Sequence, residues 1–200
     1  MWIQTFYSHL NDLGTAGFVM ANGAMTTNNS GERNVRQFMI DNCIIDCIVR
    51  LPDKLFMTTG IPACLFFLSR NREGKDGYRA RKDEILFIDA SKMGTMATRR
   101  LRVFNDEDII RISSAYNEWR MVNRHYKDVT GFCKVATLQE VIKQDYKLTP
   151  GIYVGSEAQE DDGIPFKEKL NLLKGKLCKQ FDESNLLQNK ISSNLNGLIK

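Results

Sequence analysis

The hydrophobic pattern of the first ninety residues switches repeatedly between helical spacing and short continuous apolar runs. Apolar side chains recur on one helical face over residues 2–13, and Gly14 follows as a stop signal. Asn29 with Glu32 has the spacing of a capping box, which predicts a helix to about residue 40. Continuous apolar runs predict buried strands at 16–20, 43–51, 63–68 and 85–88. This alternation predicts an α/β fold.

Residues 70–155 have a different pattern. The charged stretch 70–83 contains two glycines, which predicts a surface connection of the hairpin type. An amphipathic helix is expected to open at Asn105 or Asp106. Its predicted apolar stripe is Ile109, Ile112, Tyr116 and Trp119. A short strand is expected near 132–135, and a helix is expected after the capping pair Thr137 and Glu140.

The C-terminal region has the spacing of a long helix. Residues 156–163 are acidic and poor in apolar side chains, which indicates a linker, and Pro165 suits a first helical turn. A heptad-like seam follows, comprising Leu170, Leu173, Leu177, Leu187, Ile191 and Leu198. Two interpretations stay open, a helical hairpin and a single partner-binding helix. The predicted organisation is 1–104, an α/β domain; 105–155, a mixed helical extension; 156–164, a linker; and 165–200, a helix.

Composition narrows the class of protein. The chain is 42% hydrophobic and 26% charged, as in ordinary globular proteins, and no apolar run approaches the roughly 20 residues of a membrane span. Its N-terminus lacks a secretory pattern, so we expect a cytoplasmic protein with no membrane partner. The five cysteines lack framework spacing and clustered histidines, which favours reduced, mostly buried thiols over a metal site.

Several stretches of the sequence resemble, in the same order, motifs of one protein family. The stretch LPDKLFMTTGIPACLFFLSR from Leu51 to Arg70 resembles a late motif of adenine-N6 DNA methyltransferases, in particular the modification subunit of type I restriction–modification systems. Further strings resemble the same subunit: GFVMANGAM at 17–25, IIDCIVRLP at 44–52, EILFIDASKMG at 84–94, DEDIIRISSAYNEWR at 106–120, LTPGIYVG at 148–155 and EDDGIPF at 160–166. The resemblance implies the distal half of a Rossmann-like S-adenosylmethionine-dependent methyltransferase sheet, followed by a helical C-terminal extension.

Two signatures of that family are missing from the sequence. The family's Phe-x-Gly-x-Gly turn binds S-adenosylmethionine, and its Asn/Asp-Pro-Pro-Phe/Tyr motif receives the adenine amino group. The four prolines here are isolated, and the pair Gly14 and Gly17 comes between a helix and a strand. The resemblance implies that the chain begins within the methyltransferase domain. S-adenosylmethionine is thus expected in the complete enzyme, and no catalytic, cofactor or metal residue is expected in these 200 residues.

The resemblance assigns Phe56 to the aromatic platform on which a flipped adenine stacks. An ordinary alternative is that Phe56 packs beneath its own loop. Asn22 and Gly23 follow a strand, where α/β sheets bind ligands, and are candidates to line the base pocket. The alternative for this pair is a plain strand-to-loop turn.

Candidate DNA contacts lie nearby in the sequence. Thr58 and Thr59 are candidates to border the DNA entrance. Arg99, Arg100 and Arg102 form a basic cluster, which indicates either a phosphate-binding patch or a solvated surface. For Asp46 and Asp89 we expect structural caps rather than general bases.

Two functions follow. The first is the distal part of a modification subunit, which methylates adenine N6 in DNA together with a specificity subunit and a restriction (translocase) subunit, and which is inactive as this chain alone. The second is a non-catalytic DNA-binding or subunit-assembly module. A sheet without its first strands would also expose an apolar edge, which predicts self-association.

Overall fold

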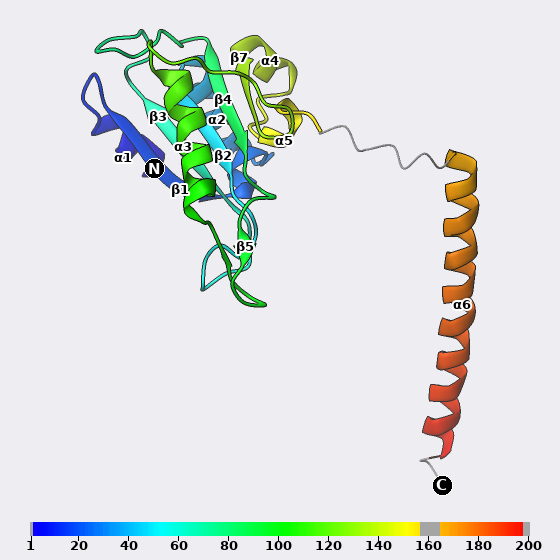
Figure 1. The fold of residues 1–200 in the computed structure, drawn as a ribbon. Coiled ribbons are helices and arrows are strands. Elements are labelled where there is room, and N and C mark those ends of the chain that lie inside the picture. The colour runs from blue at the N-terminus through cyan, green and yellow to red at the C-terminus, as the bar shows by residue number, and fades with distance from the viewer. Residues whose placement is uncertain (1, 157–164, 198–200) are drawn as a thin grey trace. The chain divides into compact units, whose positions relative to one another are not determined.

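The computed structural model describes residues 2–156 and 165–197, and the chain divides into the units Met1–Glu157 and Ala158–Lys200. The first unit is built on a five-stranded sheet in the order β1-β3-β2-β4-β7 (Figure 1). Its strands are β1 (Thr15–Ala21), β2 (Ile45–Arg50), β3 (Ala63–Ser69), β4 (Glu84–Asp89) and β7 (Cys133–Thr137). Strands β2 and β4 run parallel, and the other neighbouring pairs are antiparallel. The predicted α/β class is confirmed, as a mixed sheet.

Three helices of the first unit begin at a side-chain cap. The helices of this unit are α1 (Trp2–Ser8), α2 (Ser30–Asp41), α3 (Asp106–Arg120), α4 (Leu138–Lys143), α5 (Pro150–Tyr153) and the 3-10 turn η1 (Asn22–Met25). Asn29, Asn105 and Thr137 each accept a hydrogen bond from a backbone N–H of the helix that follows. The three predicted helix starts are confirmed. Helix α1 ends five residues before the predicted end at residue 13, so that prediction was too long.

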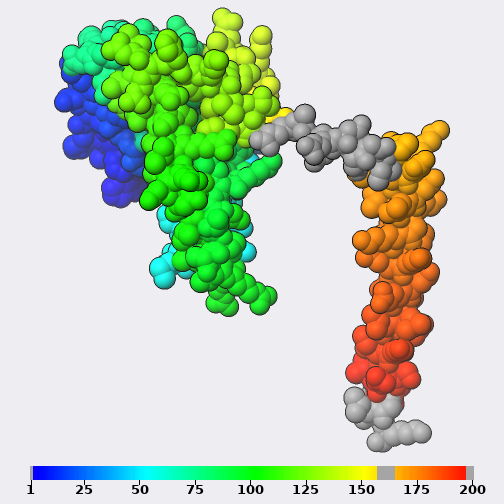
Figure 2. Space-filling view, viewed as in Figure 1, coloured from blue at the N-terminus to red at the C-terminus, as the bar shows by residue number. Residues whose placement is uncertain are grey.

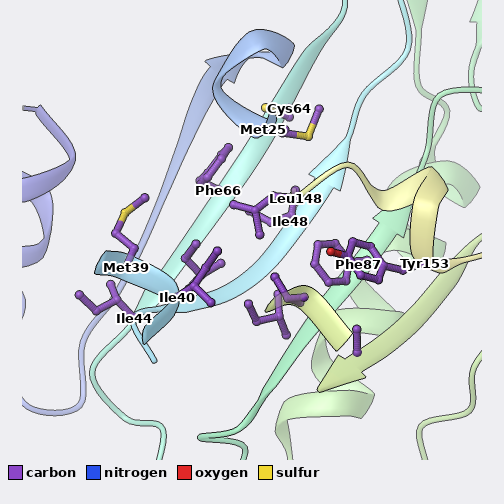
Figure 3. Close-up of a cluster of buried hydrophobic side chains, with 14 of the residues drawn as sticks. Met25, Met39, Ile40, Ile44, Ile48, Cys64, Phe66, Phe87, Leu148 and Tyr153 are labelled. Carbon is purple, nitrogen blue, oxygen red and sulfur yellow. The ribbon is translucent and has the colours of Figure 1, made fainter. Parts of the chain in front are cut away.

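The sheet carries a hydrophobic core on each face. Ile48, Phe66 and Phe87 belong to the core that α2 and α5 cover, and the Phe87 ring stacks on Tyr153 with centroids 4.0 Å apart (Figure 3). Their sequence neighbours belong to the other core, which α3 covers with Trp119. Because side chains alternate along a strand, a strand that is apolar at successive positions must be covered on both faces. The two-sided burial predicted for residues 63–68 is therefore confirmed.

Strand β1 departs from the prediction of a buried strand. It pairs with β3 along its whole length and has no strand on its other side among the described residues. Its residues alternate between exposed and half-buried, and Val19 is 52% exposed. The prediction was wrong because a short apolar run does not distinguish an edge strand from a central one. The free edge is compatible with self-association, which stays a prediction.

The charged segment 70–83 is also different from its prediction as a surface connection. Arg72 and Arg81 are buried and both form ion pairs with the Asp46 carboxylate of β2. The Arg81 Nε lies 2.8 Å from Asp46 Oδ1, and the Tyr116 hydroxyl of α3 donates to Asp46 Oδ2 at 2.7 Å. Segment 70–83 is therefore fastened to both the sheet and α3. The prediction failed because composition does not show that two arginines share one buried carboxylate.

A β-bulge places Asp46 where these partners meet. The register of β2 against β3 shifts between Ile45 and Cys47. Consequently Ile45 and Ile48 both join the core under α2, although strict alternation would put them on opposite faces. Asp46 instead bonds Tyr116 on the α3 side. Asp46 is thus the centre of a buried ion cluster and not the helix or strand cap that was predicted.

Helix α3 differs from its predicted stripe at one position. Trp119 is 1% exposed and Ile112 and Tyr116 pack on the core beneath α3, but Ile109 is 53% exposed. Ile109 was wrongly assigned to the buried face. Helix α3 follows a two-stranded hairpin of β5 (Thr95–Met96) and β6 (Arg102–Val103), which the hydrophobic pattern did not predict.

The second unit contains the helix α6 (Phe166–Gly197). It is one continuous helix over 32 residues, so the helical-hairpin interpretation does not describe it. The predicted seam residues from Leu170 to Ile191 are 48–59% exposed. Leu198 and residues 157–164 of the predicted linker lie outside the described residues. Within 2–156 and 165–197, no helix combines the length and apolar character that a membrane span requires.

We predict that Asp46→Asn lowers the free energy of unfolding by about 3–5 kcal/mol, because it leaves two buried arginines without a countercharge. Urea denaturation at neutral pH measures the change. The control is Asp83→Asn, since Asp83 lies in the same charged segment but is exposed. Equal unfolding midpoints for the two variants would contradict a structural role for the cluster.

Candidate functional site

Three segments lie at the end of the sheet where β1, β2 and β4 have their carboxyl ends, called the site edge below. The strand register pairs Ala21 with Ala63 and pairs Arg50 with both Cys64 and Asp89. The carboxyl ends of β1, β2 and β4 therefore lie together, beside the start of β3. The segments that leave the site edge are the turn at Asn22, the loop 51–62 and the segment 90–104. Ligands in open α/β sheets bind beyond the carboxyl ends of strands, so the site edge is the candidate site.

The loop 51–62 holds Phe56 half-buried. The Thr59 N–H donates to the Phe56 carbonyl at 3.3 Å, and the Lys54 N–H donates to the Gly60 carbonyl at 3.4 Å. Phe56 packs on the core beneath α3, whereas Thr58 and Thr59 are exposed. The partly buried Phe56 thus packs on the core, in line with the alternative interpretation, and its role as a base platform stays a prediction.

The turn after β1 leaves one polar atom without a partner. Asn22 and Gly23 begin η1, where the Gly23 carbonyl accepts from the N–H groups of Thr26 and Thr27 at 3.1 and 2.9 Å. Among the described residues, the buried Asn22 Oδ1 has no hydrogen-bond partner. A cleft of about 580 Å³ opens beside Gly23, between α1, β1 and α2. A buried acceptor that lacks a donor is energetically costly.

The basic cluster divides into an exposed pair and a bound member. Arg99 and Arg100 lie in the turn between β5 and β6, and both are exposed. No carboxylate in the described part of the chain lies within ion-pair distance of either one. Arg102 is half-buried, and its Nη2 lies 3.5 Å from Asp53 Oδ1. Nothing in the sequence pattern pointed to Asp53, whose partner is 49 positions away.

Asp89 and the cysteines lie outside the groups described above. Asp89 caps its own turn, since its Oδ1 accepts from the Ser91 N–H at 2.9 Å, as predicted. In residues 2–156 and 165–197 no group of three or more His, Cys, Asp or Glu side chains could hold a metal ion. Cys47, Cys64 and Cys133 are buried, Cys43 is half-buried and Cys178 is exposed.

Burial also determines the protonation of the Tyr116 hydroxyl, which contacts the ion cluster. Burial raises the pKa of Tyr116, and the Asp46 carboxylate raises it further. The hydroxyl therefore stays protonated and donates to Asp46. Tyr116 is a structural donor rather than an acid or base.

Gly14 and Gly17 do not form a turn of the kind that binds S-adenosylmethionine. A cofactor turn needs glycines between a strand and a helix, where backbone can approach the ligand. Gly17 lies within β1 instead, and a Cβ there would come within 2.9 Å of the Phe67 ring. Gly17 is thus explained by packing against β3.

Comparison with known proteins decides the family. The family described as N-6 DNA methylase matches residues 1–162. The chain belongs to the N-6 DNA methylase family. Among relatives, the chain is 42% identical over 197 residues to the type I restriction enzyme HindI methylase subunit of Haemophilus influenzae, covering 98% of this chain. It is 38% identical over 199 residues to the MjaIX methylase subunit of Methanocaldococcus jannaschii, covering 99% of this chain.

A solved structure agrees with the family. The type I restriction–modification methyltransferase subunit from Streptococcus thermophilus matches 76% of this chain and 29% of that one, with a TM-score of 0.63 and 26% identity. The sequence resemblance to type I modification subunits is therefore confirmed. The chain spans less than half of the length of these two relatives, 43% and 34% respectively.

Proposed function

We propose that this chain is the distal part of a type I modification subunit and supplies the base-receiving wall of an adenine-N6 DNA methyltransferase. The observation that carries the proposal is the meeting of three candidate segments at the site edge in a member of the N-6 DNA methylase family. These segments carry an aromatic side chain, an unpaired amide oxygen and an exposed pair of arginines. These groups suit a base, an N–H donor and a phosphate, respectively.

Each group has a physical role in receiving an extruded adenine. The target amino group cannot be reached inside a duplex, so the base must leave the stack. The half-buried ring of Phe56 offers a face for stacking, worth about 1–3 kcal/mol per base. Asn22 Oδ1 offers an acceptor for an amino hydrogen, and the next residue, Gly23, lines the cleft between α1, β1 and α2, whose lining does not include Asn22 or Phe56.

The DNA backbone would contact the exposed parts of the site edge. Arg99 and Arg100 carry charges that no described carboxylate neutralises, which suits phosphate contacts. Thr58 and Thr59 are exposed beside Phe56 and border the entrance for the base. The methyl donor, S-adenosylmethionine, would be bound by parts of the complete enzyme that lie outside these 200 residues.

Helix α6 would bind a partner subunit. Its seam residues are about half exposed along a helix that would span roughly 48 Å at 1.5 Å per residue. A long apolar stripe of this kind is typical of helices that pack against another helix. We infer that it docks on helices of the specificity subunit, while the restriction (translocase) subunit joins the same assembly. The alternative, a non-catalytic DNA-binding or assembly module, is favoured for the isolated chain by this stripe.

The first prediction concerns base stacking. In a complete subunit that carries this sequence, Phe56→Ala weakens binding of an extruded adenine by about 1–3 kcal/mol, because the stacking face is lost. Quenching of 2-aminopurine fluorescence at the target position measures stacking. The control is Phe38→Ala, which removes an exposed ring near the end of α2, next to the start of β2 and away from the site. Unchanged methylation and unchanged 2-aminopurine quenching would refute the role of Phe56.

The second prediction concerns binding of S-adenosylmethionine. Isothermal titration of the isolated chain with S-adenosylmethionine gives no binding heat, since the cofactor turn is missing from its sequence. A full-length relative, titrated in parallel, provides the positive control. Stoichiometric binding by the isolated chain would show that it holds a cofactor site of its own.

The third prediction concerns α6. Ile191→Asp weakens binding of the specificity subunit at least about tenfold, because it introduces a charge into the apolar seam. Asn189→Asp places the same carboxylate on the opposite side of the helix and leaves binding nearly unchanged. Binding is measured by surface plasmon resonance with the purified specificity subunit. Equal effects of the two variants would exclude the seam as the docking surface.

A further inference from the structure

We propose that Arg102 is a positioning residue, which fastens the Phe56 loop to the β5–β6 hairpin so that the aromatic ring and the arginine turn act as one unit. The inference rests on the proposed function of Phe56 as a base platform. It assigns Arg102 a role through Phe56 and not as a DNA contact. We call the contacts among Arg102, Asp53 and Lys54 the clasp.

The clasp joins two segments that are distant in the sequence. The Arg102 backbone N–H donates to the Lys54 carbonyl at 2.8 Å, and its Nη2 lies 3.5 Å from Asp53 Oδ1. Lys54 lies two positions before Phe56. The Arg102 Nη1 also donates to the carbonyls of Met93 and Gly94, at 3.3 and 3.1 Å. One guanidinium therefore connects the base of the hairpin with the loop that presents the ring.

Figures 1 and 2 show the same association. The loop 51–62, in cyan, and the hairpin around β5, in green, leave the same end of the first unit (Figure 1). In the space-filling view, cyan atoms lie directly beside the green atoms of the hairpin (Figure 2). Side-chain packing adds to the hydrogen bonds, because Leu55 and Phe56 of the loop and Met93 and Phe104 of the hairpin segment pack on one core.

The backbone has positive φ angles on both sides of the clasp. Gly94 has φ +80°, and a Cβ there would come within 2.8 Å of the Val103 carbonyl oxygen. This close turn brings the carbonyls of Met93 and Gly94 onto the Arg102 guanidinium. Lys54 has φ +57°, which is unfavourable for a side chain with a Cβ. Such conformations persist where surrounding contacts determine them, and the bond from Arg102 is one such contact.

Charge separates Arg102 from the other arginines of the cluster. The side chain of Arg102 is 22% exposed and faces the Asp53 carboxylate, so much of its charge is balanced within the protein. Arg99 and Arg100 are exposed, and no ion pair involves them in the described part of the chain. The arginines that remain available to phosphates are thus the two in the turn. The clasp determines where that turn lies relative to Phe56.

A direct DNA contact by Arg102 would behave differently from a clasp. If Arg102 bound phosphate, removing the Asp53 charge would free the guanidinium and remove a repelling carboxylate, and DNA would bind more tightly. If Arg102 holds the loop, removing the Asp53 charge weakens base stacking as removing Arg102 does. Asp53→Asn therefore increases the affinity for DNA if Arg102 binds phosphate, and weakens base stacking if Arg102 holds the loop.

The experiment compares Asp53→Asn, Arg102→Gln and the double variant in a complete subunit that carries this sequence. Each single variant is expected to weaken the 2-aminopurine stacking signal about two- to fivefold, the range for a partly exposed ion pair. The double variant should lose no more of the stacking signal than the more affected single variant, because each substitution already removes the same clasp. The dependence of duplex binding on salt should not change. Arg99→Gln, the matched control, should reduce that salt dependence by about one phosphate contact and leave stacking intact.

Three results would overturn the clasp. They are tighter DNA binding by Asp53→Asn, a reduced salt dependence for Arg102→Gln, and a stacking signal that both clasp variants retain. Phe56→Ala distinguishes this failure from failure of the proposed function. If Phe56→Ala abolishes the stacking signal while both clasp variants retain it, the clasp alone is wrong. If Phe56→Ala has no effect, the base platform is wrong, and the clasp falls with it.

Discussion

The buried carboxylate of Asp46 is the constraint on which the first unit depends. Desolvating a carboxylate and two guanidinium groups is expensive, and the cost is offset only when the groups meet with good geometry. The bulge in β2 provides that geometry by turning Asp46 toward α3. Arg72 and Arg81 then hold a highly charged segment against the sheet, and Tyr116 fixes α3 over the second core.

The position of the candidate site depends on how Asp46 fixes α3. Helix α3 begins at its Asn105 cap, directly after the hairpin segment that contains Arg102. With α3 fixed against the core, the base of the hairpin is fixed too, and the clasp extends that order to the loop of Phe56. Rigid elements thus place a loop-borne ring, which is how loops commonly acquire precise functional geometry.

Several parts of the fold could be predicted because their causes are local. Asn105 and Thr137 cap helices through bonds to residues three positions away, and a window of four residues contains the whole signal. The continuous apolar run at 63–68 likewise indicates by itself that both faces of the strand are covered. Of the candidate site, the order of motifs indicated the loop of Phe56 and the turn of Asn22. The half-buried state of the ring and the unpaired oxygen of Asn22 could not be predicted, because both depend on neighbours from other elements.

The sequence by itself determined the family, the α/β class, the helix caps and the identity of the chemical groups at the site. Tertiary structure alone decided which strand lies at the edge, which arginines are buried and which arginine holds a loop. The physical reason is the distance along the sequence over which each interaction acts. Caps and hydrophobic periods act over a few residues, whereas the partners of Asp46 lie 26, 35 and 70 positions away, and burial of a charge is decided only when such partners meet.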